Sequence, residues 1–323
     1  MTALKRTLLS LSLLSCLAGA PVAQADDYPS HPVRLIHGFG AGSATDITAR
    51  VMGKFLGEKL GQQFVVESRP GGASNIATEF VARAPKDGYT LLLGTSANLI
   101  NAAITPNLAF DFAKDFTPIT LIASTPLILV VHPSTGAKTV QDLITLAKSK
   151  PDQILFASAG VGTTGHMSGE LFNLRAGVRM VHVPYQGSPQ AVTDLLAGRT
   201  SVLFSPASSV MPHVEQGKLI ALASATTRRT SVAPNLPSMA EAGLPDFDTS
   251  TLFGLVAPVE TPSNVISKLS RAANEALKSD EVLAAFRTQG IDPVGGSPQD
   301  FARVIASEIA KWSEVAKATG LKK

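Results

Sequence analysis

Short apolar runs rich in Val, Leu and Ile alternate with segments of helical periodicity along most of this chain. The first long helical segment carries Ile47, Val51 and Phe55 on one face, which is typical of a helix packed on a sheet. In the first third, strands are predicted at 33–37, 64–68 and 90–94, and helices at 45–60 and 74–83. Alternation of this kind predicts the α/β class, with parallel sheets covered by helices.

The same alternation predicts two lobes. Strand runs at 119–123 and 127–132 are separated by Ser124-Thr125-Pro126, which we interpret as a connection between lobes. The pattern then repeats up to about residue 249, and after a strand at 252–257 only helices are predicted, the last one starting at Ser297-Pro298. A tail without strands is expected to return to the first lobe. We therefore predict that lobe 1 comprises 26–124 and 250–323 and lobe 2 comprises 125–249, each a mainly parallel sheet flanked by helices.

The amino terminus is typical of an export signal. Lys5 and Arg6 precede an uncharged, Leu-rich run at 7–17, which is too short to span a membrane as a helix. Ala23-Gln24-Ala25 then offers small residues at the positions that a signal peptidase recognises, so we predict a signal peptide at 1–25, cleaved after Ala25. An alternative is lipoprotein processing, with Cys16 acylated at the membrane. Either route predicts a periplasmic protein.

Composition excludes several classes of function. Cys16 is the only cysteine, so a chain cleaved after Ala25 has no disulfide, thiolate metal site or cysteine nucleophile. The 28 basic and 25 acidic residues become 26 and 25 once Lys5 and Arg6 are removed, a net charge of +1. That balance is unlike the basic surface of a nucleic-acid-binding protein.

Two glycine-rich segments stand where a predicted strand leads into a helix. The first loop is Gly38-Phe39-Gly40-Ala41-Gly42-Ser43-Ala44-Thr45-Asp46, and the second loop is Ser158-Ala159-Gly160-Val161-Gly162-Thr163-Thr164-Gly165-His166. Glycine allows close approach of the backbone to a ligand, and the free N–H groups at a helix start attract an anion. Each segment alone could be a tight turn, but one in each predicted lobe favours a shared anion-binding site.

Other polar residues lie at predicted strand ends, where open parallel sheets bind their ligands. Ser96, Tyr185 and Ser205 are candidate contacts of this kind. Ser96 lacks the closing glycine of a hydrolase nucleophile elbow, and no helix is expected directly after it. His166 and Glu170 have i, i+4 spacing, but without further ligands the pair does not predict a metal site. We therefore predict no catalytic residue, no metal and no cofactor.

A dinucleotide-dependent oxidoreductase is the alternative reading. Gly160, Gly162 and Gly165 match the G-x-G-x-x-G fingerprint, which also requires an acidic residue at the end of the next strand. The strand after the second loop ends without an acid. Glu67 ends the strand after the first loop, but there Ser43 replaces the third glycine. Neither fingerprint is complete.

The ordered motifs resemble the Bug family of tripartite tricarboxylate transporter receptors, also called TctC-like periplasmic binding proteins. The similar blocks, in order, are Pro32–Ile36, Phe39–Arg50, Val66–Gly71, Lys86–Leu92, Phe156–Gly160, Val183–Gly187, Asp194–Gly198 and Glu241–Pro245. The resemblance implies a type II Venus-flytrap fold, a monomer that captures a small carboxylate and delivers it to membrane permease subunits, and no enzymatic activity. It implies contacts at Phe39, Gly40, Ala41, Gly42, Ser43, Ala44, Thr45, Asp46, Ser96, Ser158, Gly160, Gly162, Thr163, Thr164, His166 and Tyr185. Asp46 is expected mainly to organise its own loop.

The chain departs from the family pattern at several of these positions. Gly40-Ala41 stands where the family commonly has two prolines, Ser43 where it has glycine, and His37 where it has proline. Ser205 stands where many relatives place an aspartate. The loss of that negative charge favours a more anionic ligand, so we expect an aliphatic or aromatic dicarboxylate.

Overall fold

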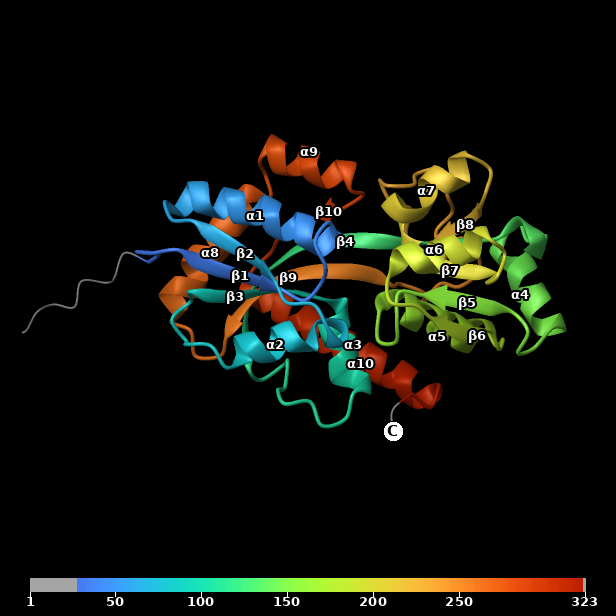
Figure 1. Ribbon diagram of the computed structural model, residues 1–323, viewed down its shortest axis with the longest axis horizontal. Helices are drawn as coiled ribbons and strands as arrows, with labels where there is room; N and C mark the ends of the chain where they lie inside the picture. The colour runs from blue at the N-terminus through green and yellow to red at the C-terminus, as the bar shows by residue number, and fades with distance from the viewer. Residues whose placement is uncertain (1–27, 322–323) are drawn as a thin grey trace, which may run out of the picture.

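The computed structural model describes residues 28–321, and it shows two α/β lobes joined by long strands (Figure 1). The predicted signal peptide at 1–25, its cleavage after Ala25 and the alternative anchor at Cys16 lie outside the described residues. Within the described part, no helix is both long and apolar enough to cross a membrane.

The first lobe is built on three parallel strands, with β1 in the middle of the three. Leu35 of β1 pairs with Val66 of β2 on one side and with Leu91 of β3 on the other, and all three strands lead into helical segments. These elements are β1 (Val33–His37), α1 (Ala44–Leu60), β2 (Phe64–Ser68), η1 (Gly72–Ser74), α2 (Asn75–Ala82), β3 (Thr90–Thr95) and α3 (Ser96–Ile104). The predicted strands and helices agree closely with this order, except that α3 was not expected.

The second lobe repeats the arrangement on β5, which runs parallel to both β6 and β7. Its core includes Phe156, Met167 and Phe172, all fully buried. The elements of this lobe are η2 (Pro133–Thr135), α4 (Val140–Ser149), β5 (Leu155–Ser158), α5 (Thr164–Ala176), β6 (Val181–Pro184), α6 (Ser188–Leu196), β7 (Val202–Pro206), α7 (Ala207–Glu215) and β8 (Ile220–Ser224).

Two antiparallel strands, β4 (Phe116–Val131) and β9 (Ser250–Pro258), connect the lobes (Figure 1). The expectation of two separate strand runs around Ser124-Thr125-Pro126 is wrong, because β4 is continuous through them. Pro126 has no N–H to donate, but it lies opposite Ser250 at the last pair of the β4–β9 ladder, where the missing donor is tolerated. Beyond it, β4 continues against β7 and β8, so one mixed sheet extends through both lobes.

The carboxyl-terminal tail contains α8 (Ser263–Ala276), α9 (Asp280–Thr288), the two-residue strand β10 (Asp292–Pro293) and α10 (Pro298–Ala318). No strand was expected there, but Asp292 pairs with Ser124 of β4. The tail covers the first lobe, with Phe301 of α10 in its core. The other end of the same helix reaches further, since Trp312 is buried in the core of the second lobe. Helix α10 thus packs on both lobes. The predicted two-lobed α/β class is confirmed.

Candidate functional site

The parallel strands of both lobes end near the middle of the connecting strand β4. Thr95, at the end of β3, pairs with Phe253 of β9, which pairs in turn with Ala123 of β4. Pro206, at the end of β7, pairs with Leu127 of β4. A strand rises about 3.3 Å per residue, so these two ends are roughly 13 Å apart along β4. The helices that follow the strands therefore begin on facing sides of the two lobes.

The first loop connects β1 to α1 and is held by its own side chains. Ser43 caps α1, accepting a hydrogen bond from the Asp46 amide at 3.2 Å. The Asp46 carboxylate accepts from the Gly42 amide at 2.9 Å and from Arg50 Nε at 3.0 Å, and His37 Nε2 lies 3.2 Å from its other oxygen. Both carboxylate oxygens of Asp46 therefore have partners within the loop and the adjoining elements, and the side chain stabilises the loop.

The charge of Asp46 is fixed by these contacts. Burial alone would raise its pKa, but the hydrogen bonds from Arg50 and Gly42 outweigh burial and lower the pKa below its usual value. Burial lowers the pKa of His37 despite the adjacent Asp46, so this histidine is neutral at neutral pH. Asp46 of the first loop consequently remains ionised and paired with Arg50 of α1.

The tip of the first loop offers backbone donors. Gly40, Ala41 and Gly42 are exposed, and a Cβ added at Gly40 or Gly42 would meet nothing within 4 Å. Among residues 28–321, none accepts a hydrogen bond from the N–H of Gly40 or Ala41. Together with the free N–H groups in the first turn of α1, these donors form the positive end of a helix aimed outward.

The second loop connects β5 to α5 and has the same construction. Thr163 caps α5, accepting from the His166 amide, and its hydroxyl donates to Gly160 O at 2.7 Å. Gly160 and Gly162 have φ of 132° and 79°, which a side chain would strain. Within the described chain, no acceptor is found for the N–H of Val161, whose side chain is exposed. This loop, too, presents backbone donors and no cation.

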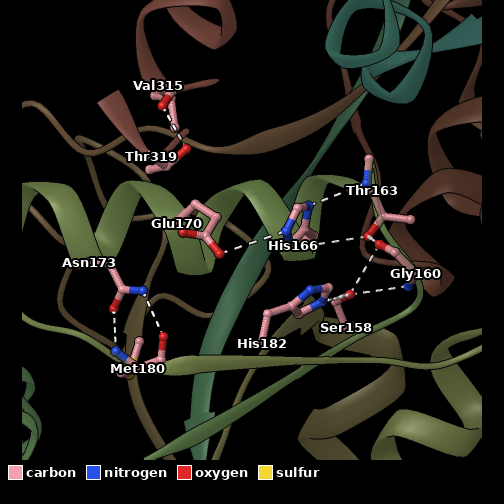
Figure 2. Close-up of polar contacts among 11 residues, drawn as sticks. Ser158, Gly160, Thr163, His166, Glu170, Asn173, Met180, His182, Val315 and Thr319 are labelled. Carbon is pink, nitrogen blue, oxygen red and sulfur yellow. Dashed lines mark hydrogen bonds and ion pairs between the residues drawn. The ribbon is translucent and has the colours of Figure 1, made fainter. Parts of the chain in front are cut away.

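Two histidines lie behind the second loop (Figure 2). The Gly162 amide donates to His166 Nδ1 at 3.3 Å, and Ser158 Oγ lies 2.6 Å from His182 Nε2. Burial lowers the pKa of His166 to about 4, and burial together with His166 lowers the pKa of His182 to about 3. His166 was predicted as a ligand contact, but it is 1% exposed and bonded to its own loop. His182 was assigned no role from the sequence.

An unbroken series of contacts joins the two loops. A Cβ at Gly38 would lie 2.1 Å from Ser74 Oγ, so the first loop packs directly on the start of α2. Asn75, the first residue of α2, accepts from Asn101 Nδ2 of α3 at 3.2 Å. A Cβ at Gly162 would lie 2.8 Å from Asn101 Oδ1, so the second loop rests on α3. The structure therefore brings both loops to one region between the lobes.

The sequence missed the segment that completes this region. Ala73 and Ser74 have positive φ values of 50° and 78°, unusual for residues with a side chain. Such backbone strain is concentrated at functional sites. Gly71-Gly72 after a strand was the available signal. Helix α3 was also missed, although Thr95 and Asn98 form a capping box.

Among the remaining candidates, Ser96 and Tyr185 use their hydroxyl groups within the fold. Ser96 Oγ donates to Ser250 O at 3.2 Å and accepts from the Leu252 amide at 2.8 Å, so it fastens α3 to β9. Tyr185 donates to Asp194 at 2.8 Å and lines a shallow surface groove of about 380 Å³ with residues of α6. Ser205 is a buried position of β7 opposite Ile128. Thr45 and Thr164 lie in the first turns of α1 and α5.

The residues for a dinucleotide or a metal do not fit. Glu67, the acid that a first-loop fingerprint would use, accepts two hydrogen bonds from Arg34 at 2.6 and 2.8 Å, and this ion pair lowers its pKa. His166 Nε2 and Glu170 Oε1 are 3.7 Å apart, and the described residues contain no cluster of three or more side chains suited to a metal.

Two α/β lobes joined by long strands, with two loops that offer backbone donors and contain no Lys or Arg facing each other at the junction, define a solute-binding protein of the periplasmic type. Residues 48–321 match the model of the tripartite tricarboxylate transporter family receptor, TctC. The chain belongs to this family, as its motifs predicted.

Individual relatives are similar to this chain along nearly its whole length. BugT of Bordetella pertussis is 36% identical, covering 98% of each chain. Rpa4515 of Rhodopseudomonas palustris, solved with adipate, is 37% identical with a TM-score of 0.81, covering 91% of this chain and 98% of its own. MatC of the same organism, solved with malate, is 29% identical with a TM-score of 0.79, covering 89% and 99%. None of these relatives supports the oxidoreductase reading.

Proposed function

We propose that this chain is an extracytoplasmic solute-binding protein that captures a small dicarboxylate, aliphatic or aromatic, for a tripartite tricarboxylate transporter. The observation that carries the proposal is the pair of donor loops at α1 and α5, which face one region from two lobes and contain no lysine or arginine. Helix starts of this kind bind anions through N–H groups and the helix dipole. The bound adipate and malate of two relatives support the ligand class.

The ligand contacts are assigned to the two loops rather than to every candidate residue. The first loop contributes the amides around Gly40 and Ala41 and the hydroxyl of Ser43. The second loop contributes the Val161 amide and the first turn of α5, starting at Thr164. Ser96, Tyr185 and Ser205 act indirectly, because their side chains are already bonded or buried.

Binding is coupled to lobe closure. The lobes 26–124 with 250–323 and 125–249 move about the β4 and β9 crossings, and closure brings the second loop onto a ligand held by the first. Each hydrogen bond to a charged group contributes about 1.5–3 kcal/mol. Three or four of them, less the cost of ordering, reach the approximately 8 kcal/mol of a micromolar site.

Export and delivery complete the proposed role. The signal at 1–25 directs the chain to the periplasm, either released after Ala25 or anchored through Cys16. There the protein acts as a monomer, binds its acid without changing it, and passes it to the permease subunits of the transporter. Neither cofactor nor metal takes part.

A thermal-shift panel on the mature chain tests this function. Mono-, di- and tricarboxylates, amino acids and NAD are each added to the protein. A ligand at a hundredfold its Kd adds about 2.7 kcal/mol to the free energy of unfolding, which is a clear rise in Tm. The proposal requires a rise with at least one dicarboxylate. A rise with NAD alone contradicts it.

A further inference from the structure

His166 and His182 form a close, tilted pair next to the second loop (Figure 2). Their ring centroids are 4.0 Å apart at an interplanar angle of 32°, and Phe156 stacks on His182 with centroids 4.9 Å apart. The rings come from α5 and β6, and Phe156 comes from β5. Two imidazoles in contact are expected to repel if both are charged, and burial keeps this pair neutral.

The hydrogen bonds fix the tautomer of His166. The Gly162 amide is a donor, so Nδ1 must present its lone pair and the ring proton must reside on Nε2. Nε2 faces Glu170 Oε1 at 3.7 Å. A proton on Nδ1 would set two donors against each other and release Gly162 from its strained turn.

His182 contacts the start of the second loop through Nε2, whereas His166 contacts the middle of the loop through Nδ1. His182 Nε2 is hydrogen-bonded to Ser158 Oγ at 2.6 Å. The same hydroxyl accepts from the Gly160 amide at 3.1 Å and lies 3.1 Å from Gly160 O. The two histidines thus hold the start and the middle of the second loop with different ring atoms, Nε2 in one and Nδ1 in the other.

We propose that His166 and His182 are positioning residues of the binding site: as neutral rings they hold the Ser158 hydroxyl and the Gly162 amide from behind, and they do not touch the ligand. This inference rests on the proposed function of the second loop. At the second loop, the anion meets the backbone donors that the pair holds in place.

Because the two histidines use different ring nitrogens, Asn and Gln substitutions should have opposite effects at the two positions. Asn at position 166 keeps an acceptor near the place of Nδ1, whereas Gln places its amide near Nε2. We expect His166→Asn to keep the Kd for the best-binding dicarboxylate within about threefold, and His166→Gln to raise it roughly tenfold, the loss of one buried hydrogen bond. At position 182 the order reverses, so His182→Gln keeps affinity and His182→Asn loses it. A purely space-filling role would not produce this reversal.

A ligand-free measurement separates this inference from the proposed function. Nitrogen-15 NMR of the mature wild-type protein should show the His166 proton on Nε2 and both rings neutral at pH 7. If no carboxylate binds the wild type, the proposed function fails whatever the tautomer. If a dicarboxylate binds but all four variants bind it equally, or if His166 carries its proton on Nδ1, the positioning role is overturned. If the variants fail to fold, the tautomer of His166 in the wild-type protein still tests the positioning role.

Discussion

Asn101 and Gly162 touch across the two lobes: a Cβ at residue 162 would lie 2.8 Å from Asn101 Oδ1. Asn101 also donates to Ala73 O at 2.9 Å, so one amide side chain from α3 contacts η1 and the second loop together. Gly162 has a φ of 79°, which disfavours any side chain there. This contact is where the first lobe limits the position of the second loop.

Gly162→Ala should therefore destabilise the protein and weaken binding. The left-handed backbone alone costs about 1–2 kcal/mol for a residue with a Cβ, and the contact with Asn101 adds to it. Chemical denaturation and isothermal titration measure the two effects. Gly40→Ala is the matched control for stability, because its Cβ would meet nothing within 4 Å. Equal stability of both variants would contradict the contact.

Asp46→Asn distinguishes an organising carboxylate from one that faces the ligand. We expect weaker binding and a loss of about 1–3 kcal/mol in stability, since the buried bonds to Gly42 and Arg50 are impaired. If Asp46 faced an anionic ligand, its neutralisation would strengthen binding instead. Glu58→Gln, on an exposed part of the same helix, should change neither quantity.

Tyr185→Phe should leave the affinity within about twofold, well below the effect of a lost ligand hydrogen bond. Its hydroxyl donates to Asp194, away from the two loops. Isothermal titration with the best-binding dicarboxylate measures the change. A tenfold loss of affinity would show that the hydroxyl contacts the ligand after all.

Stability should fall as the pH is lowered from about 6.5 to about 4. The unfolded chain protonates His166 near its usual pKa of 6.5, whereas burial lowers its pKa to about 4 in the folded protein. The unfolded state therefore binds more protons in this window, and His166 alone contributes roughly 1.4 kcal/mol per pKa unit, or about 3 kcal/mol. Burial also lowers the pKa of the neighbouring His182, to about 3, so His182 adds a loss of stability in the same direction.

Denaturant unfolding at a series of pH values measures this loss, with His166→Asn as the comparison. Half-buried Glu170 faces His166, and desolvation raises the pKa of Glu170, which acts in the opposite direction. The difference between wild type and variant isolates the histidine. A variant with the same pH slope as the wild type would show that His166 is not responsible.

The parts of the site that depend on residues close together in the sequence, namely the two loops and the helix starts after them, were predicted correctly in position. Glycine-rich segments between a predicted strand and a helical pattern sufficed to place both loops and the starts of α1 and α5, where the structure shows Ser43 and Thr163 as helix caps. Contacts distant in sequence were not predictable: Ser96 bonds to Leu252, and Ser158 to His182. Pro126 suggested a break in a strand that tertiary pairing keeps continuous.

The proposed binding mode requires that one acid is shared by the first and second loops. A crystal structure of the mature protein with its best-binding dicarboxylate tests this directly. The prediction is one carboxylate within hydrogen-bond reach of amides from both loops, around Gly40–Ala41 and Val161–Thr164. A ligand bound to one loop alone, or outside the region between the lobes, would contradict it.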